Sequence, residues 1–360
     1  MMMTNMTTNL DTPLDQQDWT VAMATNFTMP LDEQIGWFPT EMIWVRSVLI
    51  AFFMAVGLAG NFLTLVAIKR TPSLHNATTA FIASLGVADL MFCALVMPPE
   101  IVLFSENTWL NGNSILCVLQ TFLEYLSVAG SLFSISLISL NRFVLIICPP
   151  GVYQRLYQRR WVAAQIAGVW SFSLGMLTPT LAGAWGRFGY QPRLRSCAIL
   201  PVNGRSPNVA LFIIAFLVTC AVISVCYLAI LIAVLRSNRR QRQHLAPQKG
   251  EVRSQRTLRQ RRHEVRVTRM SLAVFMAFIV CFAPLTVANI WDVGYDHPVL
   301  HVIGYVAVCV SCSINPIIYV TLSKQYRRAY WSLFSCGKPR RSSETSSNVL
   351  QAPQAPWSPA

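Results

Sequence analysis

Charged side chains are scarce in this sequence. Lys, Arg, Asp and Glu make up only 12% of the 360 residues, whereas a soluble domain carries about 25%. Hydrophobic residues reach 54%. This balance argues against an ordinary soluble domain and indicates a protein that places most of its surface in lipid.

The sequence also lacks the motifs of common enzymes and of nucleic-acid binders. It has no Gly-rich phosphate loop and no Ser-His-Asp arrangement, and its five histidines are scattered rather than spaced as metal ligands. The net charge of +14 does not gather in a folded basic domain. We therefore expect neither an enzyme nor a nucleic-acid-binding protein. No internal repeat is present, which argues against the remote alternative, a membrane transporter.

Seven long apolar segments dominate what is present. They are Ile43–Ile68, Thr79–Phe104, Ile115–Cys148, Trp161–Trp185, Val209–Leu235, Met270–Trp291 and Val299–Leu322. Each is long enough to cross a hydrocarbon layer of about 30 Å as an α-helix. The sequence therefore predicts an all-α membrane protein, a seven-helix bundle over residues 43–322.

The distribution of basic residues predicts how the bundle is oriented. With the N-terminus outside, 24 of the 29 Lys and Arg residues lie on the cytoplasmic side. Residues 236–269 hold twelve of them and are expected to form a basic third cytoplasmic loop and the inner end of helix six. Residues 1–42 are expected to be an extracellular tail, residues 323–336 an amphipathic eighth helix, and residues 337–360 a disordered cytoplasmic tail.

Three positions are candidates for covalent modification. Asn5 and Asn26 each begin an N-x-T sequence in the predicted extracellular tail and are glycosylation acceptors. Cys336 ends the amphipathic stretch at the inner face, where it is either palmitoylated or a free thiol. No basic start is followed by an apolar core, so we expect the first span to serve as its own signal.

Short polar and proline motifs follow the spans in a fixed order. They are "GN" at Gly60–Asn61, "SLGVADL" with Asp89, "NRF" at Asn141–Phe143, "CFAP" at Cys281–Pro284 and "NPIIY" at Asn315–Tyr319. Together with seven spans and two cysteines on the outer side, Cys117 and Cys197, this set resembles the rhodopsin-like G-protein-coupled receptors. No single motif is specific, but the ordered set is. The resemblance covers about Trp44 to Cys336.

The resemblance implies a fold, a location and partners. It implies a multi-pass plasma-membrane receptor for an extracellular small molecule or peptide. This receptor would activate heterotrimeric G proteins when helix six moves outward at its inner end. Arrestin and membrane lipids are further implied partners. A Cys117–Cys197 disulfide is implied, and the oxidising outer side permits it, with two free thiols as the alternative.

Arg142 stands in the middle of an apolar run, which is costly for a permanent charge. It follows Cys117 by 25 residues, or about 37 Å of helix, which places it at the inner mouth of the bundle. The resemblance implies a role in G-protein coupling; snorkelling into headgroups is the alternative. The family usually has Asp before this arginine, but Asn141 stands here, which leaves Glu264 as the acidic partner.

The resemblance implies two further polar or aromatic sets. Switch residues are expected at Phe143, Tyr227, Phe282, Pro284, Asn315, Pro316 and Tyr319. A cluster that binds a sodium ion or water is expected from Asn61, Asp89, Ser131, Ser311 and Asn315; an Asp89 held neutral by hydrogen bonds is the alternative. Thr219 stands in span five where the family commonly has proline. Without this proline, the helical bulge that the family has in span five is not implied here.

Glu124 is the main candidate for ligand binding. It precedes Arg142 by 18 residues, which is five helical turns, so both face the bundle interior about 27 Å apart. We expect it to be the counter-ion of an amine or basic peptide; the rival is a protonated Glu124 that donates to a neutral indole-like or lipid-like ligand. His301 is the nearest basic candidate in the sequence. Further candidate contacts are Tyr125, Thr180, Trp291, Tyr295 and Tyr305.

The outer loop "YQPRLRSC" and the "NRF" motif look most like the melatonin receptors and their orphan relatives. Melatonin receptors, however, have Asn where Thr180 stands and Gln where Gly189 stands, which argues against melatonin as the ligand. Cys309 stands where opsins hold a lysine. A retinal Schiff base therefore cannot form.

Replacing Asn141 by Asp should lower basal signalling. The acid would restore a partner for Arg142 that is worth about 1 kcal/mol, or about fivefold in the active population. Agonist-free guanine-nucleotide exchange in membranes measures this. Equal or higher exchange in Asn141→Asp would show that the missing acid does not set basal activity.

Overall fold

The computed structural model describes residues 38–106, 115–203, 207–243, 251–292 and 294–334, with only the backbone for 237–243 and 251–265. Within these ranges seven helical segments are long and apolar enough to cross a membrane, which confirms the seven predicted spans. They are Thr40–Arg70, Ala77–Ser105, Ile115–Ile147, Arg159–Leu181, Asn208–Arg236, Arg266–Trp291 and Pro298–Leu322. The predicted modification sites Asn5, Asn26 and Cys336 lie outside the described residues.

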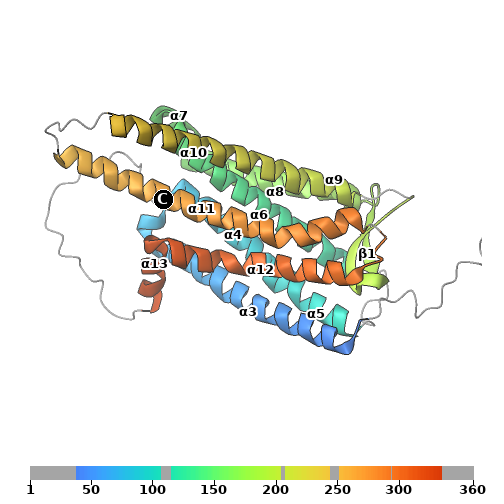
Figure 1. The fold of residues 1–360 in the computed structure, drawn as a ribbon. Coiled ribbons are helices and arrows are strands. Elements are labelled where there is room, and N and C mark those ends of the chain that lie inside the picture. The colour runs from blue at the N-terminus through green and yellow to red at the C-terminus, as the bar shows by residue number, and fades with distance from the viewer. Residues whose placement is uncertain (1–37, 107–114, 204–206, 244–250, 293, 335–360) are drawn as a thin grey trace, which may run out of the picture.

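The spans form one elongated bundle (Figure 1). Its helices are α3 (Thr40–Arg70), α4 (Ala77–Met91) continued by α5 (Met97–Glu106), α6 (Ile115–Ile147), α8 (Arg159–Leu181), α9 (Asn208–Phe212) continued by α10 (Thr219–Gln243), α11 (Glu251–Trp291) and α12 (Pro298–Leu322). A hairpin of β1 (Arg187–Gln191) and β2 (Ser196–Leu200) lies at one end, called here the hairpin end. Helix α13 (Lys324–Phe334) lies across the opposite end, called the α13 end, and α7 (Pro150–Leu156) is a short helix between α6 and α8.

The bundle is apolar outside and partly polar inside, the reverse of a soluble protein. Val225 and Val280 are 65% and 67% exposed, whereas Asn61, Asp89 and Asn141 are almost fully buried. Lipid cannot hydrogen-bond, so the outer surface carries hydrocarbon and the polar side chains turn inward toward one another. This distribution identifies a multi-pass membrane protein.

Two spans contain a wide helical turn. The π-helical segment Phe92–Val96 joins α4 to α5 just before a Pro-Pro pair, and Ile213–Val218 joins α9 to α10. Proline lacks an N–H and disrupts the regular ladder, which accounts for the first of these segments. The second ends directly before Thr219. A bulge is therefore present in span five although Thr219 replaces the usual proline.

Several helix ends differ from the prediction. The fourth span ends at Leu181 rather than Trp185, because Gly183 adopts a left-handed conformation with φ 71°. Asn76 caps α4 by accepting a hydrogen bond from the Thr79 amide at 3.0 Å. The Asn-Ala-Thr sequence at residues 76–78 is therefore the start of a helix.

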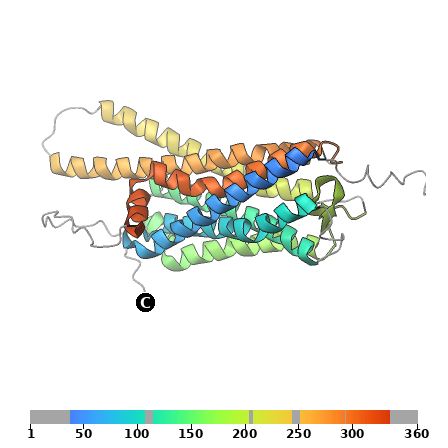
Figure 2. The same cartoon turned by 90° about the horizontal axis from the view of Figure 1, so that it is seen from below.

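The predicted third cytoplasmic loop is mostly helical. Helix α10 continues to Gln243 and α11 begins at Glu251, and Figure 2 shows both helices projecting past the α13 end. Most of the basic 236–269 run thus belongs to two helices. Sequence reasoning missed this because a polar, basic segment has no apolar periodicity that marks it as helix.

Helices α11 and α12 approach closely at Gly304. A Cβ atom at this position would lie 2.6 Å from the Leu285 Cα, which is inside contact distance of backbone. A glycine here therefore allows the two helices to pack backbone against backbone, as small residues do in membrane bundles.

Gly304→Ala should destabilise the bundle by about 1–3 kcal/mol, since the added methyl forces α11 and α12 apart. Thermal unfolding of purified protein in nanodiscs measures this. Gly168→Ala is the matched control, because Gly168 lies in the middle of α8 and a Cβ atom there would meet nothing within 4 Å. A Gly304→Ala protein as stable as Gly168→Ala would contradict the close packing.

Candidate functional site

The hairpin covers its end of the bundle and is tied to α6. Strands β1 and β2 pair antiparallel, with Tyr190 opposite Cys197. Cys197 forms a disulfide with Cys117, which lies near the start of α6, with a Cα–Cα distance of 5.6 Å. The structure thus contains the disulfide that the family resemblance implies. The bridge holds β2 close to the side chains that follow on α6.

A charged cavity lies beneath the hairpin, with an empty volume of about 590 Å³. Its lining includes Arg46, Glu100, Glu124, Ser196, His301 and Tyr305. Arg46 of α3 and Glu100 of α5 form an ion pair, and both side chains are almost completely buried. A buried pair of this kind requires further hydrogen bonds to offset the cost of desolvation.

Glu100 has those further bonds. Its Oε2 accepts hydrogen bonds from Gln120 Nε2 at 2.8 Å and from Ser196 Oγ at 3.0 Å. The ion pair therefore connects α3, α5, α6 and β2. Sequence analysis missed this pair, although a signal existed: Arg46 and Glu100 are charges within apolar spans, and each needs a partner.

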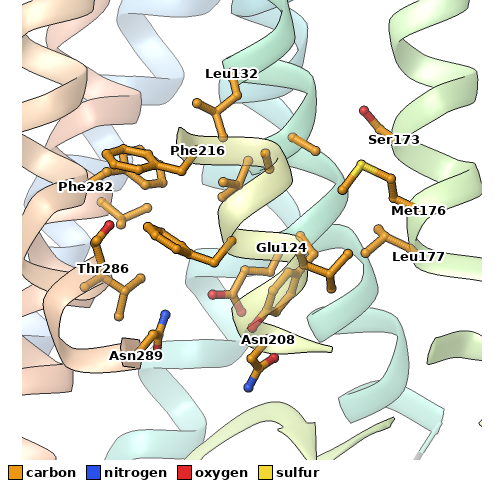
Figure 3. A pocket seen from close by; sticks show the side chains of 18 residues that line it. Glu124, Leu132, Ser173, Met176, Leu177, Asn208, Phe216, Phe282, Thr286 and Asn289 are labelled. Carbon is orange, nitrogen blue, oxygen red and sulfur yellow. The ribbon is translucent and has the colours of Figure 1, made fainter. Parts of the chain in front are cut away.

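An apolar cavity adjoins the charged one, with an empty volume of about 840 Å³. Leu132, Met176, Leu177, Phe216 and Phe282 contribute to its walls (Figure 3). The Phe282 ring stacks on Phe278, with 4.0 Å between the ring centroids. The largely apolar lining is that of a small-molecule site.

Glu124 belongs to the walls of both cavities, and Figure 3 shows its carboxyl group pointing into the apolar one. Its carboxylate forms no hydrogen bond or ion pair with any side chain that the structure describes. Two basic residues, Arg46 of the first span and His301 of the last, line the charged cavity together with Glu124. His301 Nε2 lies 3.2 Å from Asp292 Oδ2, and its part in balancing the charge of Glu124 stays a prediction.

Asp292 organises the turn between α11 and α12. Its carboxylate accepts hydrogen bonds from the backbone amides of Asp296 and His297, both at 2.8 Å, and from His301. Burial raises the pKa of Asp292, but these amides and the two imidazoles outweigh burial, so its pKa lies below the ordinary value. The Asp292 carboxylate thus fixes the position of His301.

The other predicted ligand contacts divide into two groups. Tyr125, Tyr295 and Tyr305 line the charged cavity. Trp291 is 66% exposed and packs on His297 with 4.8 Å between the rings, and Thr180 is buried in α8; neither lines the two cavities. A ligand contact at these two positions stays a prediction, because sequence spacing does not reveal how a helix end is rotated.

The predicted polar cluster at mid-bundle is only partly assembled by direct contact. Asp89 accepts hydrogen bonds from Ser131 at 2.9 Å and from Asn315 at 2.8 Å. Asn61 instead donates to the Gly57 and Cys312 carbonyls, and its buried Oδ1 has no partner among the described residues. Asp89, Ser131 and this amide oxygen are hard ligands that suit a sodium ion. Sodium binding stays a prediction. Ser311 is buried without a described bond to Asp89.

Arg142 lies buried at the α13 end. Its Nη2 donates to Thr78 Oγ1, and Thr78 in turn donates to Asn141 Oδ1 at 2.6 Å. Thr78 is a partner that sequence analysis did not predict. The backbone of Glu264 belongs to α11, but its side chain lies outside the described part of the chain, so its pairing with Arg142 stays a prediction.

The predicted switch aromatics are buried near this end. Tyr319 packs against Tyr326 of α13 with 5.3 Å between the rings, and Tyr227 packs against Phe275 of α11 at 6.2 Å. Phe143 is partly buried against the same core. Pro284 and Pro316 lie inside α11 and α12.

Residues 60–319 match the family model of the 7 transmembrane receptor (rhodopsin family). The chain is 36% identical to G-protein coupled receptor moody of Drosophila melanogaster over 84% of its length, but spans only 53% of that relative. It is 30% identical to melatonin receptor type 1B of Mus musculus, covering 80% of this chain and 78% of the relative. The fold matches squid rhodopsin with a TM-score of 0.71, at 19% identity over 84% and 89% of the two chains.

The structure is a multi-pass bundle with a disulfide-tied hairpin over two cavities, and the family model that it matches is that of a membrane receptor. The chain belongs to the rhodopsin family of seven-transmembrane receptors. Its relatives include the melatonin receptors, which confirms the branch that the sequence resembles.

Asp292→Asn should lower the melting temperature at neutral pH by a few degrees, because bonds to a charged acceptor are lost. The pKa of Asp292 is lower in the folded protein than in the unfolded chain. Its contribution to folding stability is therefore present above the unfolded pKa of about 4 and is lost as the pH falls through the folded pKa. The melting temperatures of wild type and Asp292→Asn should therefore converge in acid. Asp296→Asn is the control, since the Asp296 side chain is 70% exposed. Equal melting of wild type and Asp292→Asn at pH 7 would contradict this role.

Proposed function

We propose that this chain acts in the plasma membrane with its hairpin end outside and its α13 end in the cytoplasm. The basic 236–269 run supports this orientation, because it lies where α10 and α11 project past the α13 end. Lys and Arg concentrate on the cytoplasmic side of membrane proteins. The N-terminus is then extracellular and the C-terminus cytoplasmic.

We infer that an extracellular ligand enters beneath the hairpin and places a positively charged group at Glu124. The observation that carries this inference is the position of Glu124, in the walls of both cavities and without a polar partner among the described residues. A carboxylate in such a place is costly unless a cation joins it. An ammonium group on an amine or a basic peptide supplies that cation.

One observation favours a second candidate, a neutral indole-like or lipid-like ligand. Phe216, Phe282 and Leu132 give the apolar cavity walls that suit hydrocarbon or a flat ring. In this case Glu124 is protonated and donates a single hydrogen bond.

We propose that the ligand signals through α11. Phe282 lies in the wall of the apolar cavity, and Pro284 interrupts the hydrogen-bond ladder of the same helix two residues later. A shift in the population of two packings would swing the basic end of α11 outward and open a space beside Arg142 for a heterotrimeric G protein. Arrestin would use the same face.

Glu124→Gln should reduce the potency of a cationic agonist by about 30- to 150-fold, since a charge-assisted bond worth about 2–3 kcal/mol is lost. An uncharged agonist should lose little. G-protein reporter assays on agonists from a screen measure both, and Asp296→Asn is the matched acid-to-amide control at the same end. A cationic agonist of unchanged potency on Glu124→Gln would exclude the counter-ion and leave the neutral ligand.

A further inference from the structure

The guanidinium of Arg46 has donors that the protein does not use. Its side chain is 3% exposed, and one nitrogen, Nη2, forms the ion pair with Glu100. Nε and Nη1 have no hydrogen-bond partner among the described residues. The guanidinium also lies over the Phe104 ring, 3.8 Å from its centroid. Arg46 thus contacts Glu100 and Phe104 while the three N–H donors of Nε and Nη1 stay open.

Glu100 cannot satisfy these remaining donors. Its Oε1 receives Arg46 Nη2, and its Oε2 already accepts hydrogen bonds from Gln120 and Ser196. A buried donor without an acceptor is unfavourable, and most so when it is charged. An acceptor group from outside the protein would satisfy it.

The charged cavity gives such a group access to Arg46. Arg46 lines this cavity together with Tyr305, whose buried hydroxyl also lacks a partner among the described residues, and Glu124 lies in the same wall. The Arg46 guanidinium lies 5.1 Å from the Tyr305 ring centroid, so the two side chains are neighbours. Two unsatisfied donors thus border the cavity that Glu124 joins to the apolar one.

The charges around this cavity select the kind of ligand. Arg46 and Glu100 cancel, so an ionised Glu124 leaves the three side chains with a net charge of −1. A purely anionic ligand is repelled by this arrangement. A ligand with an ammonium for Glu124 and an acceptor for the open side of Arg46 matches both features.

We propose that Arg46 and Tyr305 form an acceptor-binding subsite and that the receptor takes a zwitterionic amphiphile. Its ammonium lies at Glu124, its carboxylate at Arg46 and its hydrocarbon part in the apolar cavity. The ammonium half rests on the proposed function of Glu124, whereas the carboxylate half rests on Arg46. The carboxylate accepts a hydrogen bond from one of the open nitrogens of Arg46, Nε or Nη1.

Three probes with the same twelve-carbon chain separate these contributions: 2-aminododecanoic acid, dodecylamine and dodecanoic acid. Their affinities for the purified full-length receptor in nanodiscs follow from the shift of its thermal unfolding midpoint with probe concentration. We expect the amino acid to bind wild type at least tenfold more tightly than the amine, and the fatty acid to bind most weakly.

Arg46→Lys keeps the charge that Glu100 requires, but its single ammonium lacks the separate nitrogens Nε and Nη1, so the tenfold advantage of the amino acid over the amine should disappear. Arg193→Lys is the matched control. Arg193 pairs with Asp296, is 37% exposed and does not line the cavity, so the advantage should persist. If Arg46→Lys does not fold, the paired Arg46→Gln/Glu100→Gln variant removes both charges together and should also lose the advantage.

An amino acid that binds wild type no better than the amine overturns the subsite. So does an advantage that survives in Arg46→Lys or in the paired variant, and so does failure of all three probes to bind. Glu124→Gln tests the other half. If it leaves amine binding unchanged while Arg46→Lys still loses the advantage, the counter-ion role of Glu124 fails and the Arg46 subsite stands.

Discussion

Every polar group inside this bundle has to find its partner within the protein, because lipid offers none. Asp89 of α4 meets this requirement with Ser131 of α6 and Asn315 of α12. Arg46 and Glu100 meet it by pairing α3 with α5. Each unpaired charge would cost several kcal/mol in hydrocarbon. The polar contacts therefore determine which faces of neighbouring helices meet, while dispersion between apolar side chains fills the remaining contact surface.

Some of the polar groups that lack a partner lie beneath the hairpin. There, Nε and Nη1 of Arg46 have no partner among the described residues, and Glu124 lies in the wall of the same cavity. At the same end of the bundle, the Asp292 carboxylate accepts hydrogen bonds from two backbone amides and an imidazole. Fully hydrogen-bonded groups such as Asp292 form the rim of the site. Polar groups whose hydrogen bonds are incomplete are left as donors and acceptors that a ligand can use.

The α13 end uses a different arrangement. Arg142 is held through the hydroxyl of Thr78, which in turn bonds the neutral Asn141. These hydrogen bonds connect α4 to α6 without a charge on the residue before Arg142, so the conformational balance of this receptor depends on hydroxyl and amide geometry as well as on charge.

Much of this protein was determined by its sequence alone. The thickness of a bilayer and the rise of a helix determine the seven spans, and the period of one helix places Glu124 and Arg142 on a common face. Only the tertiary structure decided that Arg46 meets Glu100, 54 residues away, and that Trp291 does not line either cavity. Such contacts depend on the rotation and tilt of separate helices. Close packing of two backbones, as at Gly304, sets this rotation and tilt, and the apolar periodicity of one segment does not predict them.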